Sequence, residues 1–395
     1  MSRFKAIIEV NSVDVSSKTA IEEKEISLRK AFDKKTIFLL GFAFIMLLFY
    51  LLLEEVSIFD MMEVILSASP LVLLIGTSTT FIAVLLDTYT WKILLGISSI
   101  HPSTKSTYRI QLASFSYGLL IPSAGAVETI MRVSMGTKEF LNEKEGRNAT
   151  SGEILSSVIA HRLCGLLSFI PISVFVAFAI LTYFNDIIEN EFGYRVSEEV
   201  GVSFVLIVSL ISIFVILLFI LIAKSPKKAK KVLLTILGGL AILPLISNWA
   251  KSVMEPSERM VDDFSIQFTY LAKNKFLSTI ALTLAFVSQV THWIAIFLIL
   301  QSIHVPILID QVAAVNFLGG TVDLIPVGIP GMAGLKEISL AFFLEKGLGL
   351  ISTEATAGAI LVQLVKFYFL IFIGIITYIL GKTKVTAKDL EEAIN

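Results

Sequence analysis

Charged side chains stand inside apolar stretches of the chain, and they are the residues best suited to do chemistry in it. Arg162 lies about ten residues into the apolar stretch 153–183, directly after His161. An arginine at the centre of a membrane span costs about 2.5–3.5 kcal/mol on insertion scales unless it is paired or hydrated. Arg162 therefore indicates either a structural ion pair with Glu128 or a bidentate contact to a phosphate. For His161 we consider a hydrogen-bonded core histidine first and a proton relay second.

Two glutamates, Glu128 and Glu337, each open an apolar segment just after a turn rich in proline and glycine. A carboxylate in the first turn of a helix is stabilised by the positive end of the helix dipole. The alternative is a carboxylate that meets a ligand at the tip of a broken helix, where free backbone N–H groups also point. Both interpretations stay open at this point.

A second set of polar residues accompanies Glu337. Lys366 lies too far inside the apolar stretch 356–380 to reach water easily, so pairing with Glu337 is its simplest explanation. Asp323 could cap the turn or line a cavity, and the sequence does not decide between these roles. The complete set of candidate substrate-binding residues is Glu128, Arg132, His161, Arg162, Asp323, Lys336, Glu337, Gln363 and Lys366.

Other polar residues in apolar stretches are interpreted as structural. Asp87 and Lys92 predict a charge pair at the membrane interface, and His292 and Trp293 predict packing. The chain has no Cys/His metal spacing, no serine elbow and no Walker loop, and its four histidines are scattered. We therefore expect no enzymatic activity, no cofactor and no metal. An intramembrane transferase with one of the two glutamates as its base is the enzymatic alternative.

The composition defines the class of protein that must position these residues. Of 395 residues, 55% are hydrophobic and 16% are charged, whereas a soluble protein carries about 25% charged residues. The mean hydropathy of +0.83 agrees with this, so we expect an all-α polytopic membrane protein. The net charge of −1 gives no sign of nucleic-acid binding, and the single cysteine, Cys164, excludes an internal disulfide.

Six apolar stretches are long enough to cross about 30 Å of hydrocarbon. They lie near 36–53, 68–96, 153–183, 201–223, 277–302 and 356–380. Two further stretches, 108–136 and 312–346, are interrupted by proline, glycine and charge. A third, 232–249, is short and follows a lysine cluster, and the sequence does not decide whether it crosses the membrane or lies in the interface.

Lysine and arginine predict the orientation of the chain. The first 35 residues hold eight of them, and the segment 224–231 is strongly basic. By contrast, 184–200 has one arginine and five acidic residues, and the charged residues of 54–63 are all acidic. We therefore expect a cell-membrane protein with both termini in the cytoplasm: a cytoplasmic segment 1–35, one membrane domain 36–381 and a cytoplasmic tail 382–395.

The two interrupted stretches resemble each other, and each predicts a re-entrant helical hairpin: a first hairpin in 108–136 and a second in 312–346. Proline and glycine end one half-helix and permit a tight reversal before the next. The predicted turn residues are Pro122, Gly125, Pro330, Gly331 and Gly334. If 232–249 lies in the interface, the hairpins enter from opposite faces of the membrane, as in an inverted repeat.

The second hairpin carries a resemblance to a known family. PGMAGLKE at 330–337, the following GLGLISTEATAGAILVQLVKFYFLIFIG and the upstream THWIAIFLILQSI are similar to the lysylphosphatidylglycerol synthase transmembrane-region family of flippase-like membrane proteins. In the first half, SYGLLIPSAGAVETIMR and HRLCGLL match in their places, so the resemblance covers about 36–381. The chain departs from the family pattern at three positions: Met332 replaces a glycine, Gln363 an arginine, and His161 an acid.

The resemblance implies that the protein moves an anionic or aminoacylated phospholipid, or a polyprenyl-phosphate-linked sugar, between leaflets. Related chains add a synthase or glycosyltransferase domain, but only 14 residues follow Gly381 here, so we expect no such domain. The alternatives are an ion- or proton-coupled carrier of a small polar solute and an accessory scaffold for envelope assembly. The expected partners are membrane lipids, without nucleic acid; a glycosyltransferase or lipid synthase partner and a homo-oligomer are compatible with the chain.

Overall fold

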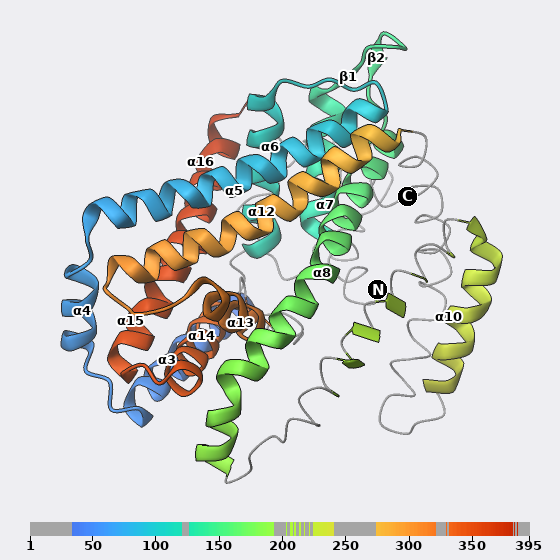
Figure 1. Cartoon of the computed structure of the whole chain (residues 1–395). Helices are drawn as coiled ribbons and strands as arrows, with labels where there is room; N and C mark the ends of the chain where they lie inside the picture. Colours follow the sequence, from blue (N-terminus) through green and yellow to red (C-terminus); the bar gives the residue numbers. More distant parts are fainter. Residues whose placement is uncertain are drawn as a thin grey trace.

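The computed structural model of the chain is almost entirely helical (Figure 1). It describes residues 34–120, 126–192, 224–240, 274–320, 329, 332–381, 383 and 385, with isolated positions between 203 and 221. Four helical segments in this part of the chain are long and apolar enough to cross a membrane: Pro70–Ile97, Ser151–Ile180, Lys275–Ser302 and Ser352–Leu380. The prediction of a polytopic membrane protein is therefore confirmed, and these four segments match four of the six predicted spans.

Two long antiparallel helices, α5 (Pro70–Ile97) and α12 (Lys275–Ser302), lie side by side (Figure 1). The amide of Ser69 donates to the carbonyl of Ser302 (2.7 Å), so the start of α5 meets the end of α12. Farther along, the Ser288 hydroxyl donates to the carbonyl of Ala83 (2.9 Å). The helices approach closely because small residues line the contact: a Cβ on Gly76 would lie 3.0 Å from the Ile299 side chain.

Both interrupted stretches form helical hairpins. The first consists of α6 (Thr104–Leu120) and α7 (Ala126–Glu139), and the second of α13 (Ile309–Gly320) and α14 (Leu335–Leu348). The two helices of each hairpin contact each other. In the first hairpin the approach requires a glycine, because a Cβ on Gly118 would lie 2.8 Å from the Glu128 Cβ. The predicted turn residues Pro122, Gly125, Pro330 and Gly331 lie outside the described residues.

The hairpins begin at opposite ends of the pair formed by α5 and α12. α6 follows the end of α5, and α13 follows the end of α12 (Figure 1). Because α5 and α12 are antiparallel, the first hairpin starts at one end of the pair and the second at the other. Each hairpin is followed by a long helical segment, α8 (Ser151–Phe192) after the first and α15 (Ser352–Gln363) with its continuation after the second.

The last span contains a π-helical turn. α15 runs into the π-helix η3 (Leu364–Tyr368), which continues as α16 (Phe369–Leu380). π turns of this kind are rare and occur often at functional sites. Here the turn carries Lys366, Phe367 and Tyr368, three consecutive side chains whose contacts are described below.

The first predicted span, 36–53, is not a simple crossing. α3 (Lys34–Leu53) is followed by α4 (Ile58–Leu66), and the apolar parts of the two helices are bent by 96° at the break between them. At its far end α3 is tied to the base of the second hairpin, because Tyr50 Oη donates to Glu345 (3.3 Å). Lys346 pairs with Glu345 (2.7 Å) and with Glu54 (3.3 Å). The hydrogen bond to Glu345, and after it the one to Glu54, raises the pKa of the Lys346 ammonium.

The remaining predicted apolar stretches are only partly described. Of 201–223, only isolated helical positions are described. The lysine cluster begins α10 (Pro226–Leu240), which covers the first part of 232–249.

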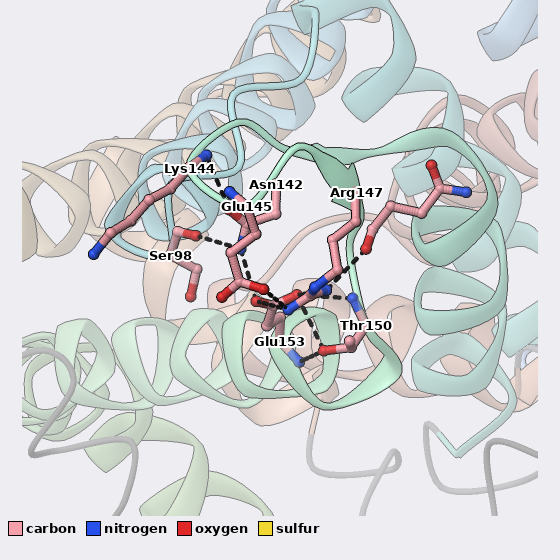
Figure 2. A network of polar contacts seen from close by, with 8 residues as sticks. Ser98, Asn142, Lys144, Glu145, Arg147, Thr150 and Glu153 are labelled. Carbon is pink, nitrogen blue, oxygen red and sulfur yellow. Dashed lines mark hydrogen bonds and ion pairs between the residues drawn. The ribbon is translucent and has the colours of Figure 1, made fainter.

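A small polar cap closes the base of the first hairpin (Figure 2). A two-stranded turn, β1 (Leu141–Asn142) with β2 (Arg147–Asn148), connects α7 to α8. Glu153 in the first turn of α8 accepts hydrogen bonds from the Thr150 amide (2.8 Å), from Asn142 (2.7 Å) and from Arg147 (3.2 Å). These contacts cap the N-terminus of α8, and the bonds to Glu153 raise the pKa of the Arg147 guanidinium.

Candidate functional site

A polar cavity lies where the two halves of the molecule meet. Its volume is about 410 Å³, and helices from both halves line it. The polar side chains of its wall are Asp87, Gln111, Glu128, Arg132, His161, Arg162, Gln289, His292, Asn316 and Lys366. The apolar part of the wall includes Phe115, Trp293 and Phe367. Because ionisable groups are costly within an apolar helical bundle, this concentration makes the cavity the candidate functional site.

Arg132, on α7, is the centre of the polar network. Its side chain is 5% exposed and pairs with Glu128 one turn earlier (2.5 Å). The same guanidinium contacts His161 Nδ1 (2.9 Å) and donates to the Ser114 hydroxyl (3.3 Å). It also lies 5.2 Å from the centroid of the Trp91 ring, in a cation–π contact. The cost of burying this charge is therefore offset from several sides.

His161, on α8, links Arg132 to Asp87 on α5. Its Nε2 lies 3.0 Å from Asp87 Oδ1, and Gln111 Nε2 donates to the other carboxylate oxygen. A continuous chain of contacts therefore runs from Glu128 through Arg132, His161 and Asp87 to Gln111. This agrees with the interpretation of His161 as a hydrogen-bonded core histidine, and it leaves a proton relay open.

The predicted interfacial pair of Asp87 and Lys92 is wrong. Asp87 faces the cavity, whereas Lys92 donates to the Thr104 hydroxyl (2.9 Å). The reason is helical geometry: residues five apart are separated by about 140° around the helix axis, so they point to different sides. Trp293 is part of a buried hydrophobic cluster, as the packing interpretation predicts, and both His292 and Trp293 also line the cavity.

Arg162 forms the predicted contact with Glu128, at 3.5 Å, and is the most exposed residue of the cavity wall. Its side chain is 43% exposed, in contrast to the buried Arg132. Leu166 and Phe169, four and seven residues farther along α8, lie on the same helix face and are 50% and 41% exposed. The cavity thus opens beside a stripe of exposed apolar side chains.

Lys366 reaches the cavity from η3 and donates to Asn316 Oδ1 on α13 (3.2 Å). The predicted ion pair between Lys366 and Glu337 does not form. Glu337 instead accepts the Gly334 amide (2.7 Å) with one oxygen and the Tyr368 hydroxyl (2.5 Å) with the other. It therefore caps the start of α14, which was the structural interpretation of this glutamate.

The other predicted residues of the second half lie behind the cavity wall. Lys336 is buried, and its ammonium lies 3.9 Å from the centroid of the Phe367 ring, which itself faces the cavity. Gln363 is also buried and is not part of the wall. Asp323 lies outside the described residues, so its predicted role is untested.

The structure therefore brings together five of the nine candidate residues: Glu128, Arg132, His161, Arg162 and Lys366. The sequence interpretation missed Asp87 and His292, together with the amides Gln111, Gln289 and Asn316. A signal for them existed, because each is a polar residue within an apolar helix. That signal is weak for amides, which also occur in such helices as hydrogen-bonding partners between helices.

The cavity wall carries more positive than negative charge. Among the described residues of the wall, three cations, Arg132, Arg162 and Lys366, accompany two carboxylates, Asp87 and Glu128, so the excess in this set is one positive charge when the histidines are neutral. Within the described part of the chain no group of three or more His, Cys, Asp or Glu side chains could hold a metal ion. An anionic group therefore fits this cavity by charge.

Fold and site together define a multi-pass α-helical membrane protein with a charged cavity between two helical hairpins. A comparison of the sequence with family models identifies its family. Residues 38–374 match the family model of the lysylphosphatidylglycerol synthase TM region, so the chain belongs to that family and the resemblance drawn from its motifs is confirmed. None of the curated proteins compared with the chain matches it.

Proposed function

We propose that the protein is a lipid translocase, which moves an anionic or aminoacylated phospholipid or a polyprenyl-phosphate-linked sugar across the membrane. The family relates the chain to lipid metabolism. In the proposed mechanism, the charged headgroup occupies the cavity between the hairpins while the acyl or prenyl chains stay in the bilayer. No catalytic step is part of this proposal.

The observation that carries the proposal is the open side of the cavity. Arg162 is exposed on the same face of α8 as Leu166 and Phe169, which are suited to contact lipid chains. A carrier of a water-soluble solute needs an entrance lined by polar groups. A positively charged cavity that opens beside apolar side chains instead suits an amphiphile with an anionic headgroup.

We further propose that the two halves form an inverted repeat, with 201–223 as an additional span and both termini in the cytoplasm. Reciprocal packing supports the repeat. Phe115 of the first hairpin stacks on Phe367 of the last span (centroids 6.5 Å apart), and Phe317 of the second hairpin stacks on Phe169 of α8 (5.7 Å). Each hairpin thus packs its first helix on the span that follows the other hairpin.

Translocation in proteoliposomes tests the proposal. Fluorescent short-chain lipids with phosphatidylglycerol, lysyl-phosphatidylglycerol, phosphatidylcholine or polyprenyl-phosphate headgroups are incorporated, and a membrane-impermeant quencher reports the leaflet that each occupies. We expect at least one anionic or aminoacylated probe to equilibrate faster with protein than in empty liposomes. Arg162→Gln and Lys366→Gln should each reduce this rate at least tenfold.

The matched control is Lys92→Gln, which removes a lysine that bonds to Thr104 outside the cavity and should leave the rate unchanged. Wild-type protein that accelerates no probe of the panel would contradict lipid translocation. The carrier of a small polar solute would then become the leading candidate, with the accessory scaffold after it. Partner enzymes and self-association would be sought by cross-linking in native membranes.

A further inference from the structure

We propose that His161 takes up a proton when the cavity binds an anionic headgroup, so that lipid and proton cross the membrane together. This inference rests on the proposed function and adds its energy source. It starts from the position of the imidazole, held between a guanidinium and a carboxylate at 2.9 and 3.0 Å.

The neighbours of His161 determine its protonation state in the structure. A guanidinium has only donors, so the ring nitrogen that faces Arg132 must accept a hydrogen bond and carry no proton. The carboxylate of Asp87 accepts, so the opposite ring nitrogen must carry the proton and donate it. In this arrangement His161 is neutral: Nδ1, which faces Arg132, carries no proton, and Nε2, which faces Asp87, carries one.

Adding one proton reverses the first of these contacts. A proton on Nδ1 places two donors and two positive charges against each other, while the bond from Nε2–H to Asp87 becomes stronger. Arg132 must then turn away from His161, although Glu128 and Ser114 can still hold it. The cavity gains one positive charge and one guanidinium N–H without a partner, and both favour a phosphate.

The groups around His161 allow this change. The charged and titratable groups of the wall are Asp87 on α5, Glu128 and Arg132 on α7, Arg162 on α8 itself, His292 on α12 and Lys366 on η3. α6 and α13 contribute the neutral amides Gln111 and Asn316. From α14, which also packs on α8, Glu337 is engaged by Gly334 and Tyr368, and Lys336 lies over Phe367.

The proton must reach Nδ1 from the cavity side, because Asp87 faces the opposite nitrogen, Nε2, which already carries a proton. His161 itself lines the cavity, and Nδ1 becomes accessible from there when Arg132 turns away. The balance of the step is simple: one proton leaves water and is bound at Nδ1, and the same proton returns to water when the lipid is released. No oxidant, reductant or second ion is required.

The distribution of lipid under a pH difference tests the coupling. Proteoliposomes contain a fluorescent short-chain phosphatidylglycerol and a one-unit pH difference across the membrane, and quenching reports the leaflet occupied at steady state. With one proton per lipid moving in the same direction, wild-type protein should enrich the probe about tenfold in the leaflet that faces the alkaline side. An equal distribution would overturn the proposal.

His161→Gln identifies the residue responsible. The glutamine amide can accept from Arg132 and donate to Asp87, so it reproduces both hydrogen bonds but cannot take up a proton. The variant should distribute the probe equally, whereas the control His101→Gln, outside the cavity, should keep the enrichment. Enrichment by His161→Gln equal to that of wild type would exclude His161 as the proton carrier.

Proton uptake on binding gives a readout that does not depend on transport. In weakly buffered detergent solution, wild-type protein should take up about one proton per phosphatidylglycerol bound, and His161→Gln should take up none. If the variant binds no lipid, the ¹⁵N signal of His161 Nδ1 in wild-type protein decides: protonation on lipid addition supports the proposal, and an unchanged signal overturns it. Lipid movement that ignores the pH difference refutes the coupling alone, whereas no lipid movement at all refutes the proposed function.

Discussion

At the scale of single residues, two glutamates in equivalent sequence positions have different roles. Glu128 pairs with Arg132 and Arg162 and faces the cavity. Glu337 is enclosed by the Gly334 amide and the Tyr368 hydroxyl and caps a helix. The difference comes from their partners: α7 offers an arginine one turn after its glutamate, whereas the π turn presents a tyrosine hydroxyl to Glu337.

The two arginines beside Glu128 should differ in their contribution to stability. Removing one member of an ion pair buried within the protein costs roughly 3–5 kcal/mol, because the remaining charge stays buried without its partner. Arg132 is 5% exposed and Arg162 43%, so Arg132→Gln should lower the melting temperature in detergent far more than Arg162→Gln. The double variant Glu128→Gln with Arg132→Gln should recover part of the loss. Equal shifts for the two single variants would contradict this burial argument.

Gly334 should be more sensitive to substitution than Gly349, although both have a positive φ, of +81° and +67°. At Gly349 the backbone is left-handed helical, which costs an alanine roughly 1–2 kcal/mol. At Gly334 a Cβ would also lie 2.6 Å from the Ala43 carbonyl oxygen of α3, whereas at Gly349 nothing lies within 4 Å. Gly334→Ala should therefore reduce the melting temperature clearly more than Gly349→Ala. A similar loss for both would show that α3 can shift to make room for the added methyl group, which would contradict this prediction.

Residue identity alone predicted about half of the cavity, and the reason is physical. An arginine or lysine deep in an apolar stretch is costly enough to stand out, so Arg162 and Lys366 were found from the sequence. Asp87 was assigned to a pair with Lys92, and only the packing of α6 and α8 against α5 shows that it belongs to the site. His292 was interpreted as a packing residue because it lies next to Trp293 in an apolar stretch.

At the scale of elements, hydropathy identified the long helices well, because about 20 apolar residues leave the chain few alternatives in a membrane. It could not show that α3 and α4 are bent by 96°, since the bend lies in a short polar connection. The π turn at Leu364–Tyr368 has no sequence signature either. It matters to the site, because Lys366 bonds to Asn316 in the cavity wall while Tyr368, two residues later, bonds to Glu337.

α10 is expected to lie in the cytoplasmic interface of the membrane. Its lysines gather at its start and on one side, whereas Val232 and Ile236 share the opposite face and are exposed. A basic amphipathic helix of this kind lies flat, with its apolar face in the headgroup region. Spin labels at 232 and 236 should be shielded from an aqueous nickel reagent, while labels at 231 and 235 should be accessible. Accessibility that falls steadily from 231 to 240 would instead indicate a crossing.

At the scale of the whole molecule, the antiparallel pair of α5 and α12 places the bases of the hairpins at opposite ends. The base of the first hairpin carries the two-stranded turn of β1 and β2, with Lys144 between the strands, and the base of the second carries Leu308. The distribution of basic residues predicts that the first base is cytoplasmic and the second external. We therefore expect the two bases to lie on opposite sides of the membrane, which the following measurement tests.

Single cysteines at Lys144 and Leu308, in a Cys164→Ser background, report the two sides. An impermeant thiol reagent added outside intact cells should label Leu308→Cys and not Lys144→Cys, and inside-out vesicles should give the reverse result. Both positions are exposed, so access to the reagent is not limited by burial. Labelling of both from the same side would contradict the inverted repeat, while the cavity and its charges would still stand.

The central claim is that the cavity between the hairpins holds an anionic lipid, and native mass spectrometry of the purified protein tests it most directly. Wild-type protein should retain about one anionic or polyprenyl-phosphate lipid through mild activation, identified by its mass after release. The double variant Arg162→Gln with Lys366→Gln should lose that lipid, whereas Lys92→Gln should keep it, because Lys92 bonds to Thr104 outside the cavity. Retention of only zwitterionic lipid, or equal retention of the anionic lipid by the double variant, would contradict the account.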